Sequence, residues 1–340
     1  MNIYQITRQN YIPIKCTYDI IYRCNLKCVH CFQENNINNR CEPSFDDIVN
    51  TVSELKKLGC MELLLSGGEV FLRNDIFKLL EFLKKIKMGV VLFTNGTLLD
   101  ENKVIKLSKL YVFYVGISIY GSNEHVHDSI TQVAGSFQKS INAIKLLKKH
   151  GVRVVGKVVA MRSNAHDIKN TIDMLCGLDV EYEISPFVSE GVFNDVKPLK
   201  NRMTDEQILD CARATRPLSD AQLKTSPQND KEQLLCGAGT VTMHIAANGD
   251  VFPCMSIYRT AGNAYSNSLT EIWQNADIFR EFRNTKYVDS ECSRCINANI
   301  CTRCPGVALE ENGSFTTKPK EFCRITELWK KAYGDAEIKI

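Results

Sequence analysis

Short apolar stretches alternate with longer amphipathic stretches through the first half of the chain. Six short stretches read as buried strands; they lie at residues 17–22, 62–65, 89–94, 112–119, 153–160 and 181–185. Between them, apolar residues recur at helical spacing in residues 44–58, with Ser44 as N-cap, 75–87, 100–109, 136–150 and 165–176. This alternation predicts successive β/α units around a parallel sheet, and therefore an α/β fold.

The pattern changes in the second half. Residues 191–235 hold one segment of helical periodicity, 205–214, among prolines and polar residues, as a linker does. From residue 236 the periodicity is weak and cysteines are frequent, so this segment has a small core and needs metal for its stability. We expect five parts: an N-terminal extension at 1–16, a β/α domain at 17–190, a linker at 191–235, a cysteine-rich domain at 236–325 and a tail at 326–340.

Composition and charge exclude several classes of protein. The 340 residues are 44% hydrophobic and 24% charged, with a net charge of +3 and no long block of like charge. The distribution of charge along the chain gives no sign of a nucleic-acid-binding surface. The first ten residues lack the apolar core of a signal peptide, and the longest apolar stretch, 110–120, is too short to cross a bilayer. These features predict a cytoplasmic protein without membrane or nucleic-acid partners.

The chain has 15 cysteines, most of them in two closely spaced groups. In a reducing compartment such grouping favours metal or redox chemistry over disulfides. Five cysteines lie outside the groups, and we expect them to be buried or incidental thiols without a role; they are Cys16, Cys41, Cys60, Cys176 and Cys211.

The first group is Cys24, Cys28 and Cys31, just past the first predicted strand. Three thiolates on a cubane cluster that needs four ligands leave one iron open to a substrate or cofactor. The alternatives are half of a zinc site, which would want a fourth ligand at matching spacing, and buried cysteines that act as small hydrophobes.

This C-x3-C-x2-C motif, with His30 before its last cysteine, resembles the signature of the radical S-adenosylmethionine (SAM) superfamily. The resemblance implies that SAM chelates the open iron through its amino and carboxylate groups. Electron transfer then releases a 5′-deoxyadenosyl radical that abstracts hydrogen from a substrate. It also implies a partial (β/α)6 barrel for the six predicted units, with the loops after the strands lining the active site.

The ends of the predicted strands carry residues that fit SAM binding. Glycines let backbone approach a ligand closely, and a carboxylate can receive an ammonium group. The Gly-Gly-Glu after the second strand stands where the superfamily binds the SAM amino group, although Val70 replaces the usual proline. Judged alone, an Asn-Gly turn and a solvated serine are equally good readings of Asn95 and Ser118. The SAM contacts implied by the resemblance are Gly67, Gly68, Glu69, Thr94, Asn95, Ser118, Lys157 and Asn164.

Titratable residues are dense after the fourth predicted strand, where a barrel places its chemistry. His127 and Asp128 could shuttle protons or hold substrate as catalytic residues. They could equally cap and brace the next helix. The run 120–137 resembles peptide-modifying members of the superfamily.

The second cysteine group, with Gly249 before Cys254, resembles the seven-cysteine SPASM domain, which carries auxiliary iron–sulfur clusters. The resemblance assigns Cys292, Cys295, Cys301 and Cys323 to one cluster, and Cys236, Cys254 and Cys304 to another. The step from Cys301 to Cys304 is one residue shorter than usual. The three-cysteine cluster has an open iron or a ligand such as His244. Zinc is the rival, because two C-x2-C pairs suit tetrahedral ligation.

The resemblance implies an enzyme with three [4Fe–4S] clusters, one binding SAM and two auxiliary, that installs a thioether or carbon–carbon cross-link in a ribosomally made peptide. Alternatives are a formylglycine-forming protein maturase, a tetrapyrrole-modifying enzyme, and an iron–sulfur electron carrier or sensor. Only about 16 residues precede the first strand, too few for a leader-binding domain. We therefore expect a precursor peptide, a separate leader-binding protein and an electron donor such as flavodoxin or ferredoxin as partners.

Overall fold

The computed structural model describes residues 3–33, 42–192, 195–215 and 233–333. In the first half, helices and strands alternate as α1 (Ile3–Gln9), β1 (Lys15–Asp19), α2 (Phe45–Lys57), β2 (Glu62–Ser66), α3 (Ile76–Lys85), β3 (Gly89–Thr94), α4 (Glu101–Leu107), β4 (Val112–Ser118), α5 (Glu124–Thr131), α6 (Ser136–Lys149), β5 (Val154–Val159), α7 (Ile168–Gly177) and β6 (Glu181–Ser185). The rest comprises α8 (Asp205–Ala214), β7 (Thr242–Ile245), β8 (Asp250–Phe252), β9 (Gly262–Asn263), α9 (Leu269–Asn275), α10 (Asp277–Asn284), α11 (Pro305–Asn312) and α12 (Lys320–Tyr333).

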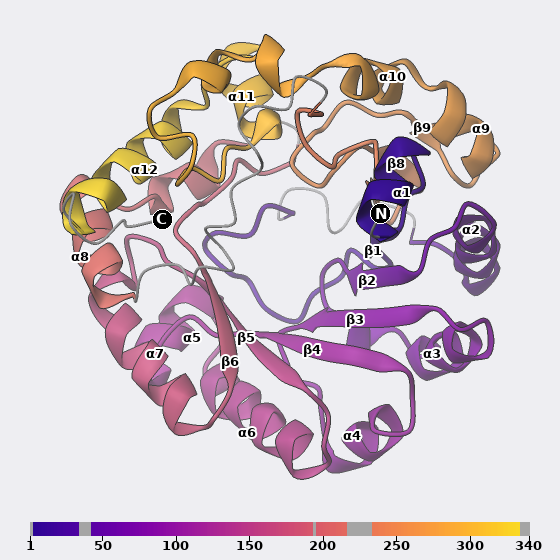
Figure 1. Ribbon diagram of the computed structural model, residues 1–340. Coiled ribbons are helices and arrows are strands. Elements are labelled where there is room, and N and C mark those ends of the chain that lie inside the picture. The colour runs from indigo at the N-terminus through magenta and orange to yellow at the C-terminus, as the bar shows by residue number, and fades with distance from the viewer. Residues whose placement is uncertain (1–2, 34–41, 193–194, 216–232, 334–340) are drawn as a thin grey trace.

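Strands β1 to β6 form a parallel sheet in chain order, and each pairs with its neighbour. Helices cover the outer face of this sheet, and its inner face looks into the middle of a ring (Figure 1). The apolar residues that alternate along each strand pack under the helices in one continuous core. The predicted α/β fold with a six-stranded partial barrel is confirmed.

The predicted ends of the first strand are shifted. Residues 17–22 were expected to be extended, whereas β1 begins at Lys15 and ends at Asp19. The Ile20 N–H still donates to the carbonyl of Ser66 at the end of β2 (3.0 Å). Ile21 and Tyr22 are buried but leave the sheet, because the Ile21 carbonyl accepts a hydrogen bond from the Gly68 N–H (2.8 Å) instead of pairing with a strand. In this segment, apolar residues therefore indicate burial and do not indicate a β-strand.

The sheet continues into the cysteine-rich part of the chain. Strand β7 pairs in parallel with β1, and β8 and β9 extend the sheet from there in antiparallel fashion. Phe279 and Phe282 of α10 belong to the same core as the barrel. In Figure 1 the orange and yellow elements from β8 to α12 complete the ring opposite β4 and β5. Strands β7, β8 and β9 were not predicted, since they have only two to four residues each.

Several other elements agree with the sequence or add to it. Helix α8 occupies the predicted residues 205–214, and Ser44 caps α2 by accepting a hydrogen bond from the Asp47 N–H. The short helix α5, capped by Asn123, was not predicted.

Within the described residues, no helix is both long and apolar enough to traverse a bilayer. Of the ungrouped cysteines, Cys16, Cys60 and Cys211 are buried and Cys176 is exposed, while Cys41 lies outside the described residues.

Candidate active site

The loop with Cys24, Cys28 and Cys31 follows β1 and crosses the middle of the ring (Figure 1). Its backbone is fixed by the end of α5: the Lys27 N–H donates to the Thr131 carbonyl (3.0 Å), and the Val29 N–H donates to the Ile130 carbonyl (3.0 Å). The unpredicted helix α5 therefore holds the cysteine loop in place.

The three thiols of this loop lie close together. Burial raises the pKa of Cys28, and the negative charge of Cys31 and Cys24 raises it further. The Leu26 N–H donates to Cys24 Sγ (3.4 Å), and the Asn95 amide lies 4.0 Å from the same sulfur. Buried thiols that repel one another as thiolates, with N–H donors aimed at sulfur, fit an iron–sulfur cluster that supplies the missing positive charge.

The Gly67–Gly68 turn packs against the chain that leads into this loop. Gly67 has a φ of 127°, and a Cβ there would lie 2.1 Å from the Ile21 carbonyl oxygen. A Cβ on Gly68 would lie 2.2 Å from the Arg23 carbonyl oxygen. Both glycines are required for this close approach of two backbones. Their first role in the structure is to place the cysteine loop.

Glu69 lies at the end of this turn and is fully buried. Its carboxylate accepts hydrogen bonds from Thr94 Oγ1 (2.7 Å), the Asn95 N–H (2.8 Å) and the Phe71 N–H (3.1 Å). Burial raises the pKa of Glu69, and these bonds oppose the rise only in part. A buried carboxylate with three donors but no cation within ion-pair distance among the described residues suits an incoming ammonium group, such as that of SAM.

Two loops meet beside Glu69. The Asn95 side chain donates to Asn25 Oδ1 (2.9 Å), and Asn25 in turn donates to Thr97 Oγ1 (2.8 Å). The loop after β3 is thereby tied to the cysteine loop after β1. Sequence reasoning singled out Thr94 and Asn95 and missed Asn25, whose only signal is its place inside the cysteine motif.

The remaining residues expected at SAM lie in different settings. Ser118 ends β4 and is half-buried next to Tyr120. Lys157 pairs with Glu183 (2.5 Å) and lies over the Phe93 ring (4.8 Å). Asn164 is completely buried, and both of its amide hydrogens bond backbone carbonyls (3.0 Å each). The Asn164 geometry favours bracing of the loop after β5 over contact with a ligand.

His127 is buried between the rings of Tyr120 and Phe137. The Tyr120 N–H donates to its Nδ1 (3.2 Å), so the neutral ring carries its proton on Nε2. Burial lowers the pKa of His127 to about 4. Its Nε2 has no hydrogen-bond partner among the described residues. His127 is thus a neutral, buried hydrogen-bond donor. The ring of Tyr120 also contacts the ring of His30 in the cysteine loop, and the Tyr120 and His30 ring centroids lie 4.7 Å apart.

Asp128 faces the start of α6. Its carboxylate accepts hydrogen bonds from the Gly135 N–H (2.6 Å), Ser136 Oγ (2.7 Å) and the Phe137 N–H (2.8 Å). Burial alone would raise the pKa of Asp128, but these bonds bring it below its usual value. This geometry favours the helix-capping interpretation over proton transfer.

Replacing Asp128 with alanine should therefore lower the free energy of unfolding by about 1–2 kcal/mol, as the loss of a helix cap does. The folded variant should still cleave SAM at the wild-type rate. Urea unfolding and 5′-deoxyadenosine release measure the two effects, and Asp128→Asn, which keeps one acceptor oxygen, should lose less stability. Unchanged stability together with lost SAM cleavage would contradict the capping role.

The cysteines of the second group lie in two sets. Burial raises the pKa of Cys236 to about 12, and the negative charges of Cys254 and Cys304 contribute. Burial likewise raises the pKa of Cys323 to about 11, with contributions from Cys301, Cys292 and Cys295. The Ala238 and Ser256 N–H groups donate to the sulfurs two residues before them (3.3 and 3.4 Å). Members of each expected set thus lie within electrostatic range of one another, and their division into ligands of two clusters stays a prediction.

The spacing of these thiols bears on the zinc alternative. Tetrahedral zinc with Zn–S bonds of about 2.3 Å holds its sulfurs roughly 3.8 Å apart. In the part of the chain that the structure describes, no three His, Cys, Asp or Glu side chains converge closely enough for one metal ion. This spacing gives the zinc alternative no support among the described residues.

His244, on β7, faces the barrel. Its Nε2 lies 3.1 Å from Asp19 Oδ2, and the same oxygen accepts a hydrogen bond from Gln33 (2.8 Å). The His244 Nδ1 is buried without a partner among the described residues. Sequence reasoning missed Asp19 and Gln33, because only the pairing of β1 with β7 brings these residues together. His244 remains a candidate fourth ligand of the three-cysteine set.

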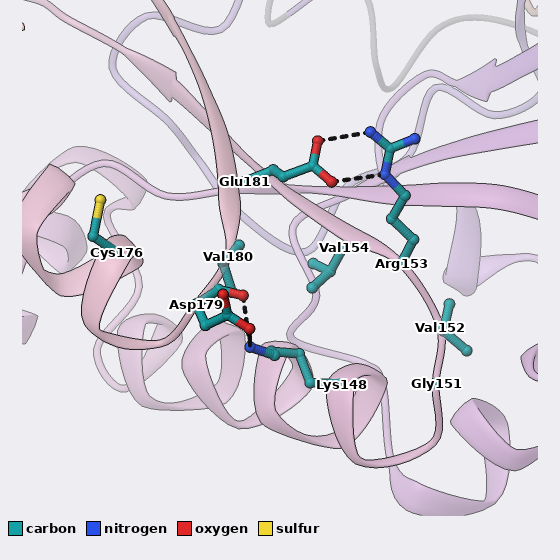
Figure 2. Close-up of a pocket in the computed structure, with 9 residues that line it drawn as sticks. All are labelled: Lys148, Gly151, Val152, Arg153, Val154, Cys176, Asp179, Val180 and Glu181. Carbon is teal, nitrogen blue, oxygen red and sulfur yellow. Dashed lines mark hydrogen bonds and ion pairs between the residues drawn. The ribbon is translucent and has the colours of Figure 1, made fainter. Parts of the chain in front are cut away.

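A hollow of about 620 Å³ lies elsewhere, at the amino ends of β5 and β6 (Figure 2). Its charged side chains are already paired, as Arg153 with Glu181 (2.6 Å) and Lys148 with Asp179 (2.9 Å). The cysteine loop follows the carboxyl end of β1, and parallel strands place that end on the opposite side of the barrel. This hollow is therefore separate from the cysteine loop.

Comparison with known proteins agrees with this geometry. A model of the radical SAM superfamily matches residues 18–175. A model of the SPASM iron–sulfur cluster-binding domain matches residues 236–296. The chain belongs to the radical SAM superfamily and carries a SPASM domain. It is a radical SAM enzyme that uses SAM and [4Fe–4S] clusters, auxiliary clusters included, which confirms these predictions and excludes a carrier or sensor.

Relatives span several reactions. The AdoMet-dependent heme synthase of Methanosarcina barkeri is 27% identical over 89% of this chain and 94% of its own. The PqqA peptide cyclase of Rhodopseudomonas palustris is 25% identical over 96% of this chain and 91% of its own. SuiB of Streptococcus suis, solved with S-adenosylmethionine, has a TM-score of 0.70 at 19% identity and covers 94% of this chain and 80% of its own.

Proposed function

We propose that this enzyme cross-links side chains within a ribosomally made peptide, as a thioether or a carbon–carbon bond. The observation that carries the proposal is the arrangement of one three-cysteine loop beside the buried Glu69, together with two further cysteine sets on the same ring. A cross-linking reaction needs both a radical source and an acceptor for the electron that bond formation releases.

The charges inside the barrel support a peptide over a tetrapyrrole. Lys157, on β5, is paired with Glu183 on the neighbouring strand β6. A tetrapyrrole carries several carboxylates and needs unpaired cations to hold them. The balanced charge of this pair suits a peptide of mixed polarity.

The relatives support the same class of substrate. One is named as a peptide cyclase, and SuiB has also been solved with its precursor peptide SuiA. The heme synthase relative, which matches over almost its whole length, makes tetrapyrrole modification the second candidate. A leader-binding protein and an electron donor such as flavodoxin or ferredoxin complete the proposed set of partners.

The residues would divide the work as follows. Cys24, Cys28 and Cys31 hold the cluster that supplies the electron for SAM cleavage when it is bound. Glu69 receives the SAM ammonium group. His127, with its unpartnered Nε2–H, is the candidate for a hydrogen bond to substrate, and Asp128 positions the helix that packs behind it.

The overall reaction removes two hydrogens from the peptide. One leaves the substrate carbon as a hydrogen atom and ends on 5′-deoxyadenosine. The other leaves as a proton and an electron when the new bond forms, and an auxiliary cluster, when bound, would supply the acceptor for that electron. One SAM is cleaved for each cross-link formed.

The number of iron–sulfur clusters follows from the number of cysteine sets. Ten cysteines in three sets should bind about three four-iron clusters, or roughly twelve irons per chain, after anaerobic reconstitution. Iron and sulfide analysis together with Mössbauer spectroscopy measures this. About four irons per chain with zinc also present would contradict the assignment of both auxiliary sets.

The function is tested by co-expressing the enzyme with short peptides encoded beside its gene and weighing the products. A cross-link predicts a product lighter than its peptide by two hydrogens. An aldehyde on a protein would instead identify a formylglycine-forming maturase. Unchanged peptides, together with conversion of a porphyrin substrate by the same protein, would favour tetrapyrrole modification.

A further inference from the structure

Arg303 lies, along the chain, between cysteines of the two auxiliary sets: Cys301 belongs to the four-cysteine set and Cys304 to the three-cysteine set.

The guanidinium of Arg303 is buried and only partly bonded. Its Nη2 donates to the Phe315 carbonyl oxygen (2.7 Å), which fixes its position. The ring of Phe315 packs against Phe282 in the core (ring centroids 4.4 Å apart). The Nε and Nη1 atoms are buried without a hydrogen-bond partner among the described residues. No carboxylate pairs with this guanidinium in that part of the chain.

The charge of Arg303 stands beside a cysteine of each set, because Arg303 directly precedes Cys304 and follows Cys301 by two residues.

An unpaired buried guanidinium is costly unless an anion meets it. A [4Fe–4S]²⁺ cluster on four thiolates has a net charge of −2, and one-electron reduction makes it more negative. A nearby buried cation, or a hydrogen bond to sulfur, stabilises the reduced form and raises the reduction potential. The two free N–H groups of Arg303 are suited to sulfur acceptors.

We propose that Arg303 is a positioning residue shared by both auxiliary clusters: its Nε–H and Nη1–H donate to cluster or thiolate sulfur, and its charge raises the reduction potential of each cluster. This inference rests on the proposed pair of auxiliary clusters and needs no peptide. A total of about twelve irons per chain, measured first, separates its failure from failure of that proposal.

The test is an anaerobic redox titration of the reconstituted full-length enzyme, followed by EPR without peptide. Arg303→Gln should retain its iron and shift both auxiliary potentials to lower values, while the SAM-binding cluster is unaffected. Arg294→Gln is the matched control, because it removes the same charge from an exposed side chain next to Cys295 and should leave every potential at the wild-type value.

Three results would overturn the proposal. They are unchanged auxiliary potentials in Arg303→Gln, a shift in only one cluster, or an equal shift in Arg294→Gln. If Arg303→Gln loses iron, Arg303→Lys becomes the deciding variant. Lysine keeps the positive charge but lacks the planar N–H donors of the guanidinium. Iron retention in Arg303→Lys, with potentials near those of wild type, supports the electrostatic role. Loss of iron there as well would reduce Arg303 to a packing residue.

Discussion

Replacing Cys28 with alanine is expected to abolish SAM cleavage and to leave the auxiliary clusters in place. Cys28 is the middle cysteine of its loop, and the negative charges of Cys31 and Cys24 both raise its pKa. Two thiolates cannot hold a cluster that needs three. The auxiliary sets draw on other segments, so about eight of roughly twelve irons should remain. Iron analysis and release of 5′-deoxyadenosine from the reduced protein measure both quantities.

Cys176→Ala is the matched control for this variant. Cys176 is exposed and lies outside both groups, so its loss should change neither the iron content nor SAM cleavage. If Cys28→Ala lost all iron, the three clusters would depend on one cooperative fold. If it kept full SAM cleavage, the catalytic role of the loop would be wrong.

Glu69→Ala should weaken SAM binding more than Glu69→Gln does. Loss of a hydrogen bond between charged groups costs about 1.5–3 kcal/mol, which is roughly a 10- to 100-fold loss of affinity. Glutamine still offers one oxygen to the ammonium group, although its charge is gone. Alanine also leaves the three donors to Glu69 without an acceptor. Equilibrium binding of SAM to the reconstituted protein measures the difference.

The stability of both variants serves as the control. Because Glu69 ties β2 to the loop after β3, Glu69→Ala should also unfold at a lower urea concentration than Glu69→Gln. A SAM affinity equal to wild type in both variants would remove Glu69 from the binding site. Equal losses in both would show that its charge alone matters.

The barrel was predictable from sequence because its short apolar strands alternate with amphipathic helices along the chain. Strands β2, β3 and β6 begin where the apolar pattern places them. The pattern failed at Ile21, where buried backbone leaves the sheet. It also failed at β7, which has four residues and gains its stability from pairing with β1, distant in the chain.

The cysteine sets were predictable because ligand spacing is local and the residue type is rare. Contacts between segments that are distant in the chain were not predictable. Nothing near His244 indicates Asp19, and nothing in C-x2-C indicates that Arg303 would be buried with two free N–H groups. The roles of Asp128 and Asn164 depend on which backbone groups they meet, and only the fold decides that.

The central claim is that this enzyme couples SAM cleavage to cross-linking of a peptide. The most direct test incubates the reduced enzyme with a purified candidate peptide and counts 5′-deoxyadenosine against product by mass spectrometry. We predict one 5′-deoxyadenosine for each peptide that loses two hydrogens, with none from Cys28→Ala. Steady 5′-deoxyadenosine release with every neighbouring peptide left at its original mass would contradict the account.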